Sequence, residues 1–151
     1  HKILIGDKNL SKIKFYENKI PDGMNNLYNY TKRGKKLFEN YKEMMTLDNF
    51  CKIYNLIPEL VKIDVEGSEL DIFNGSKKLL ENGNTIFFVS IHLKQLNYAK
   101  KNIDELKKLM SSYSYNFYDG ELNVQNEINS QEYMILNKKT YNIMLDINAK
   151  D

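Results

Sequence analysis

Cysteine is nearly absent from this sequence of 151 residues, in which Cys51 stands alone. A single cysteine cannot form an internal disulfide, and it has no second cysteine with which to build a CxxC metal or redox pair. Such sparing use of cysteine is typical of a reducing compartment. We therefore expect a cytoplasmic protein.

Long apolar runs are also missing. The longest, residues 86–89, is far too short to cross a bilayer, and the N-terminus lacks the charged and then apolar pattern of a secretion signal. Neither sign of charge dominates, because 22 basic side chains against 20 acidic ones leave a net charge of +2. That balance is too small for a general phosphate-binding surface, so we expect neither a membrane nor a nucleic acid as partner.

Glycine is sparse as well, since seven glycines are scattered along the chain and no G-x-G occurs. A glycine-rich loop that could cradle a phosphate or a nucleotide cofactor is therefore not recognisable. The sequence does contain 42% hydrophobic and 28% charged residues, over a length that suits one domain. These values predict a single folded domain over residues 1–151 with enough apolar material for a core.

The first third of the chain is predicted to contain two strands and a long loop. Residues 2–5 form a short apolar strand, a turn follows at 6–9, and Ile13 and Phe15 alternate with lysines as in a half-buried strand. The polar stretch 17–42 reads as a loop, but it is longer than most loops inside compact domains, so small strands or a functional segment are the alternatives. Because the first strand is already under way at His1, we expect a fragment that is truncated at its N-terminus, or a processed product.

The middle of the chain predicts a strand, a helix and a second strand. Thr46 is a suitable cap for a short amphipathic helix, and residues 60–65 form a β-branched run typical of a central strand. A helix over 68–82 follows, opened by a capping-box pattern at Ser68 and ended by Gly83. Residues 85–91 are almost wholly apolar, as in a parallel strand that is buried on both faces. The order is that of a βαβ unit.

The last third is predicted to hold one long helix and an antiparallel tail. Apolar residues recur every three or four positions over 96–110, which indicates an amphipathic helix against the sheet. Residues 113–118 and 132–136 read as strands, and 141–147 alternate weakly in the same manner. The fold class is therefore α/β, a sheet with flanking helices.

Carboxylates are crowded where the strand 60–65 ends. Asp64, Glu66 and Glu69 surround Gly67 at a strand-to-helix turn, and ligands of open α/β sheets bind at this edge. Crowding raises the proton affinity of carboxylates, which suits a general base, and hard cations also prefer such ligands. Alternating side chains on a strand point to opposite faces, however, so no metal site is assigned. The simpler reading is that these groups bind turn amides and favour the helix N-terminus.

The string from Leu60 to Gly67, with Glu69, Leu70 and Gly75 in register, resembles the hallmark of FkbM-type methyltransferases. The Thr46-Leu47-Asp48 helix start upstream and the Leu79-Leu80 pair downstream also match that family. The resemblance spans residues 46–92. It implies a class I methyltransferase sheet of Rossmann-like type, in which 2–5, 60–65 and 85–91 are the third, fourth and fifth strands.

The resemblance also implies the methyl donor S-adenosylmethionine. In that family the donor is held by a glycine-rich loop after the first strand and by an acidic residue ending the second strand, and both precede the third strand. This chain has neither, so the cofactor-binding strands are expected to be missing. Asp7 matches the place where related folds contact adenine, although it also suits a simple turn.

The chemistry implied is O-methylation of a hydroxyl on a sugar or a small metabolite. Such a transfer needs a base to take the proton of the acceptor. Asp64 is the first candidate, Glu66 stands beside it, and His92 is the other base suited to neutral pH, although a lone histidine is often structural. Ser90 departs from the family, which commonly has an acidic residue near the end of that strand.

Two other functions compete with methyl transfer. The D-x-E pattern also begins the two-metal 3′–5′ exonuclease signature, but that fold needs later aspartates and a late histidine, and no histidine follows His92. A methyltransferase-like module without a donor loop could instead serve only for binding or scaffolding. The region upstream of His1 distinguishes such a binding module from an active methyltransferase.

Overall fold

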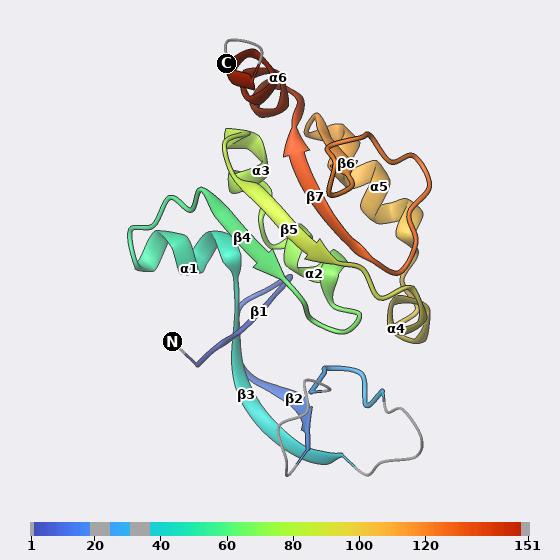
Figure 1. The fold of residues 1–151 in the computed structure, drawn as a ribbon. Helices are drawn as coiled ribbons and strands as arrows, with labels where there is room; N and C mark the ends of the chain where they lie inside the picture. The colour runs from blue at the N-terminus through green and yellow to red at the C-terminus, as the bar shows by residue number, and fades with distance from the viewer. Residues whose placement is uncertain (1, 19–24, 31–36, 149–151) are drawn as a thin grey trace.

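The computed structural model describes residues 2–18, 25–30 and 37–148. Its strands form two mixed sheets (Figure 1). The first sheet has the order β1 (Leu4–Gly6), β3 (Phe38–Thr46), β2 (Leu10–Glu17). The second has the order β4 (Leu60–Ile63), β5 (Ile86–Ser90), β7 (Glu132–Asn137), β6 (Tyr115–Tyr118). The α/β class is confirmed. The resemblance implied that β1 and β4 belong to one sheet, but among the described residues they lie in different sheets.

The second sheet contains the predicted βαβ unit. Strands β4 and β5 run parallel, with Leu60 opposite Ile86 and Ile63 opposite Val89. Strand β7 is antiparallel to both β5 and β6, so the predicted antiparallel tail is confirmed for these strands. Parallel β4 and β5 must end at the same edge of the sheet. That edge is where the candidate residues lie.

The predicted strand over 141–147 is wrong, because α6 occupies Lys138–Asn148. Tyr141 and Met144, three positions apart, are half-buried, while the two residues between them are exposed. The ring of Tyr141 stacks on that of Tyr118 at a centroid distance of 4.4 Å. This spacing is helical, and over a few residues it resembles a weak alternation.

The first sheet was only partly foreseen. Residues 38–42, within the stretch predicted as a loop, form the start of β3, although they lack an alternation of apolar side chains. It is held instead by pairing with β2 and by surface ion pairs, Lys14 with Glu39 and Lys42 with Glu17. A strand that is polar on both faces gives little periodic signal. The rest of the predicted loop falls partly on 19–24 and 31–36, which lie outside the described residues.

The predicted helix over 68–82 is two helices, α2 (Glu69–Asn74) and α3 (Lys77–Asn82), separated at Gly75. The first turn of α3 is capped from a distance, since the Asp48 carboxylate accepts from the amides of Lys78 and Leu79 at 2.9 and 3.2 Å. Asp48 belongs to α1 (Leu47–Ile53), whose predicted cap Thr46 accepts from Asn49 N–H. The Thr-Leu-Asp motif therefore caps two helices.

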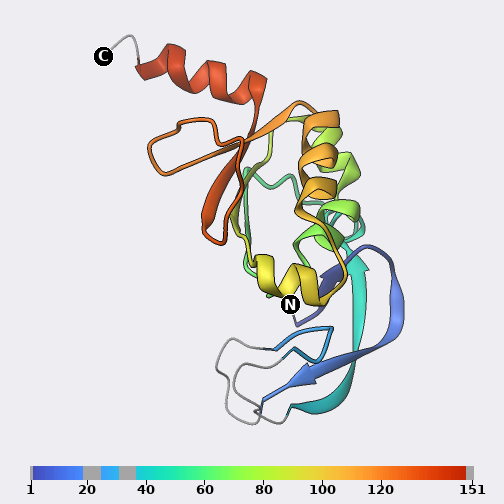
Figure 2. The ribbon, with the colours of Figure 1, turned by 90° about the vertical axis from the view of Figure 1, so that its right-hand side faces the viewer.

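The predicted helix over 96–110 is also divided. It consists of α4 (Leu93–Tyr98) and α5 (Ile103–Ser112), and Asn102 caps the second helix by accepting from Asp104 N–H at 2.8 Å. A cap inside an apolar periodicity marks a new helix start. Both α2 and α5 lie on the same face of the second sheet (Figures 1 and 2).

The core lies between that face of the sheet and its helices. Phe73 of α2 contacts Phe87 of β5 at a centroid distance of 5.1 Å, and Phe87 contacts Tyr115 at 5.8 Å. Phe87 and Val89 are fully buried, whereas Phe88, which points to the other face, is half-buried. The expectation that this strand is buried on both faces is therefore met on one face only.

Candidate functional site

The ends of β4 and β5 bring three predicted residues together. His92 follows β5, and its Nε2 lies 3.7 Å from Oδ1 of Asp64 and 3.9 Å from Oε1 of Glu66. Its Nδ1 lies 2.9 Å from Oε1 of Glu69. The site therefore consists of one imidazole and three carboxyl groups, and we refer to these four residues as the His92 cluster.

A strained turn allows Asp64 and Glu66 to face the same histidine. Glu66 has a φ of 49° and Gly67 a φ of 101°, both in the left-handed region. Gln95 holds this turn, because its Nε2 donates to Oε2 of Glu66 at 2.5 Å. A Cβ on Gly67 would lie 2.9 Å from the Gln95 backbone. Left-handed conformations at non-glycine residues are concentrated at functional sites.

Glu69 does not act as the predicted capping box. Ser68 makes no side-chain cap, and Oε1 of Glu69 accepts instead from the Gly67 amide at 3.2 Å and faces His92. The side chain is 0% exposed. Its other oxygen, Oε2, has no hydrogen-bond partner among the described residues. Sequence reasoning placed Glu69 at a helix N-terminus and missed this role; its register with Asp64 was the available signal.

The surroundings of His92 favour its charged form. The hydrogen bond to Glu69 raises the pKa of the imidazole most, burial opposes this, and the charges of Glu66, Glu69 and Asp64 raise the pKa further. His92 is 22% exposed and Asp64 47% exposed, so the cluster is open to ligands from the side of Asp64. His92 stays protonated to a higher pH than a free imidazole.

This pKa shift predicts a pH-dependent stability. Because the pKa is raised in the folded state, the stabilisation by protonated His92 is complete below its unfolded pKa of about 6.5. It is lost as the pH rises through the folded pKa. We expect the difference in free energy of unfolding between the native chain and His92→Gln to shrink across this window, as measured by urea denaturation. His1→Gln is the control; parallel curves for native and His92→Gln would contradict the shift.

Asp7, the predicted adenine contact, is not part of the His92 cluster. It is exposed directly after β1, and its charge helps to raise the pKa of Tyr28. Burial is the main cause of that shift, followed by the hydrogen bond that the Tyr28 hydroxyl donates to Asp71. Lys101 contacts both partners. These contacts hold the segment 25–30 against α2.

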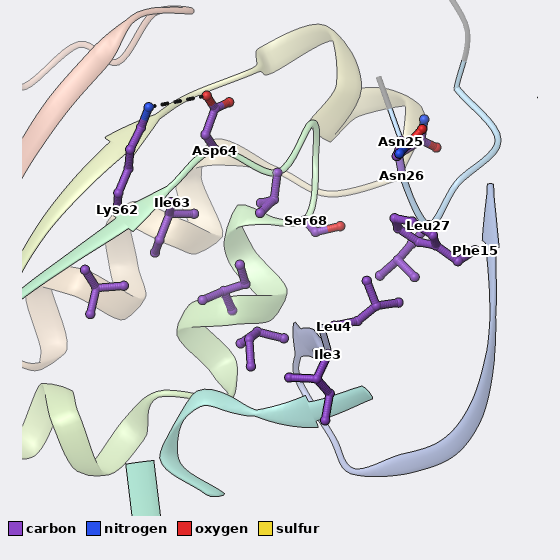
Figure 3. A pocket seen from close by; sticks show the side chains of 14 residues that line it. Ile3, Leu4, Phe15, Asn25, Asn26, Leu27, Lys62, Ile63, Asp64 and Ser68 are labelled. Atoms are coloured by element: carbon purple, nitrogen blue, oxygen red, sulfur yellow. Dashed lines mark ion pairs between the residues drawn. The ribbon is translucent and has the colours of Figure 1, made fainter. Parts of the chain in front are cut away.

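A cavity of about 360 Å³ lies between β1 and β4, beside the His92 cluster. The segment 25–30 supplies one wall, and Asp64 and Ser68 lie at another side (Figure 3). Asp64 is also 3.7 Å from Lys62, an ion pair on the same strand end. Apolar side chains from β1 and the residue before it, from β2, from β4 and from α2 line the rest: Ile3, Leu4, Ile5, Phe15, Val61, Ile63, Ile72.

Ser90, the residue that departs from the family pattern, is hydrogen-bonded to a carboxylate. Its hydroxyl donates to Oε1 of Glu132 at 3.3 Å, and Glu132 is the first residue of β7. An acidic group is therefore present near the end of β5, supplied by the neighbouring strand. Glu132 was not singled out from sequence, because its proximity depends on the pairing of β5 with β7.

No group of three or more His, Cys, Asp or Glu side chains is arranged to hold a metal ion in 2–18, 25–30 and 37–148. None of the helices in those ranges is both long and apolar enough to cross a bilayer.

The comparison with protein families decides the relationship. The model of the methyltransferase FkbM domain matches residues 1–117. The chain belongs to the FkbM methyltransferase domain family. Comparisons with curated proteins and with solved structures gave no match. The matched part of this FkbM domain contains the whole His92 cluster, whereas β7 and α6 lie outside it.

Proposed function

We propose that this FkbM domain carries the acceptor side of an S-adenosylmethionine-dependent O-methyltransferase with a class I, Rossmann-like sheet. The acceptor is a hydroxyl of a sugar or another small metabolite, and a cytoplasmic location suits the single cysteine. The observation that carries the proposal is the His92 cluster, which lies at the carboxyl ends of two parallel strands inside the family match.

The charge of the described residues suits the methyl donor, but the glycine-rich loop that would hold it is not among them. When bound, S-adenosylmethionine supplies an electrophilic methyl group carried on a positively charged sulfur. Three carboxyl groups around one imidazole favour a cationic ligand, and Asp7 is placed to bind an amine or hydroxyl beyond β1. No G-x-G occurs in the chain. The methionine and ribose ends therefore require residues other than these.

The task that falls to this chain is removal of the acceptor proton. In our proposal, Nε2 of His92 accepts the hydrogen bond of the acceptor hydroxyl and takes its proton, and the exposed Asp64 carboxylate, 3.7 Å from Nε2, stabilises the charged ring. Glu66, held by Gln95, keeps a second carboxylate beside Nε2 and stabilises the imidazolium that forms. A positioned base of this kind acts only when the acceptor oxygen is within hydrogen-bond reach.

The open edge of β4 supports the class I assignment. Among the described residues, β4 pairs with β5 on one side only, and its other edge borders the apolar cavity. An unpaired strand edge presents backbone N–H and C=O groups with which a further strand can pair. We propose that the cofactor-binding strands of the class I sheet pair with this edge and separate β1 from β4. In that arrangement residues 1–151 are one part of a larger domain.

The first test is calorimetric titration of S-adenosylmethionine and S-adenosylhomocysteine into this chain and into the product of its full reading frame. We expect micromolar binding by the longer protein, weakened at least about tenfold by Asp7→Asn, because a hydrogen bond to a charged group is worth about 1.5–3 kcal/mol. Asp104→Asn, an exposed change on α5, is the matched control. No binding by either protein would overturn the proposal and leave a binding or scaffolding module.

A further inference from the structure

The two ring nitrogens of His92 have different surroundings. Nδ1 is within hydrogen-bond distance of Glu69, at 2.9 Å, whereas Nε2 is 3.7 and 3.9 Å from the nearest carboxylate oxygens of Asp64 and Glu66. Only Nδ1 is therefore bonded. Nε2 faces the open side of the cluster, where Asp64 is exposed. In a neutral imidazole, the partner of one nitrogen decides which nitrogen carries the proton.

We propose that Glu69 is a positioning residue, whose buried carboxylate holds the His92 ring with its proton on Nδ1 and leaves Nε2 free to accept a proton. This inference rests on the proposed function and deepens it. Glu69 does not touch the acceptor in this scheme. It acts through His92, in the way that a buried carboxylate orients a catalytic imidazole.

The burial of Glu69 supports this role. A fully buried carboxylate is costly unless it is paired, and its Oε2 has no partner among the described residues. The desolvation cost of the Glu69 carboxylate is offset at Oε1, which contacts the Gly67 amide and Nδ1 of His92. An apolar side chain at the start of α2 would avoid the desolvation cost. Packing alone therefore does not explain why position 69 carries a carboxylate.

Three carboxyl groups face the imidazole and raise its pKa. Glu69 faces Nδ1 from α2, and Asp64 and Glu66 face Nε2 from the turn after β4. On β7, Glu132 is bonded to Ser90, two residues before His92. Of the first three groups, Glu69 raises the pKa of His92 most, through its hydrogen bond. Loss of the Glu69 charge should therefore lower that pKa while the other carboxylates remain.

Imidazole NMR tests the proposal without a substrate. The chain has only two histidines, so its imidazole region contains two sets of signals, and His92→Gln assigns them. In the native chain we expect neutral His92 to carry its proton on Nδ1. In Glu69→Gln we expect a lower His92 pKa and a mixture of tautomers, because the amide can present either its oxygen or its nitrogen to Nδ1. Glu81→Gln, an exposed change on α3, should alter neither quantity.

Two results would overturn the assignment: a native His92 with its neutral proton on Nε2, or an unchanged pKa and tautomer in Glu69→Gln. The native tautomer needs no variant, so it decides the matter even if Glu69→Gln does not fold. These measurements use no S-adenosylmethionine. If His92 has the expected tautomer but S-adenosylmethionine does not bind, the methyltransferase proposal alone is rejected. If the donor binds but neutral His92 carries its proton on Nε2, the role of Glu69 alone is rejected.

Discussion

Replacing His92 by glutamine is expected to lower the rate of methyl transfer about 10²–10⁴-fold, the usual effect of removing a positioned general base. The variant keeps a polar side chain near Glu69, but a glutamine amide cannot take the acceptor proton at neutral pH. The rate is measured as formation of S-adenosylhomocysteine by the product of the full reading frame, with a panel of hydroxyl acceptors. Donor affinity should change little, because His92 is placed on the acceptor side.

The control for this loss is His1→Gln, which removes the other histidine of the chain. It should leave the rate unchanged. A loss of less than about tenfold in His92→Gln would show that another group takes the proton, because a base contributes at least about 10²-fold. Asp64→Asn would then be the next variant, since Asp64 is the exposed carboxylate of the cluster.

Replacing Gly75 by alanine is expected to cost about 1–3 kcal/mol of folding free energy, the range for an overpacked site. A Cβ at Gly75 would stand well inside van der Waals contact of the carbonyl oxygen of Gly6, at the end of β1. The neighbour is backbone, so it cannot move aside as a side chain does. Urea denaturation gives the free energy, and a lower thermal midpoint should accompany it.

Gly120→Ala is the matched control. A Cβ at Gly120 has no atom within 4 Å, and Gly120 is not among the glycines with a positive φ. Its stability should stay within about 0.5 kcal/mol of the native value, as for other surface changes. If Gly75→Ala proved equally harmless, the close packing of β1 on α2 would be refuted, and with it the arrangement of the two sheets around the cavity.

Local chemistry explains which elements could be predicted. Thr46 accepts from Asn49 N–H as an N-cap should, and Gly83 ends α3 with a φ of 73°. The strands β4 and β5 occur where the β-branched and apolar runs indicated. Each of these signals depends on residues within one or two turns of each other. Such signals are present in the sequence itself.

Long-range contacts explain the errors. The break between α2 and α3 depends on Asp48, thirty residues before the amides that it caps. The first half of β3 depends on pairing with β2, and the helix α6 on stacking against Tyr118. The periodicity of a segment carries no information about these distant partners. Each of the two helix pairs therefore resembles one continuous helix in the sequence, and 141–147 resembles a strand.

In the candidate site, too, some features follow from local patterns and others from long-range contacts. Asp64 and His92 could be expected to lie close together, because parallel strands end at one edge and both residues follow such strands. Local patterns do not specify the roles of Glu69 and Glu132. The first depends on how α2 sits below the strand ends, and the second on the pairing of β7 with β5.

The sequence by itself determined the α/β class, the βαβ unit, the family and the position of the acidic turn, because these depend on local patterns and on a motif in register. Only the tertiary structure decided that β1 and β4 lie in different sheets and that Gly75 is needed for close packing rather than for its conformation. It also decided that Glu69 faces His92 instead of capping a helix. Such features depend on which distant segments meet, and side-chain chemistry alone does not specify that.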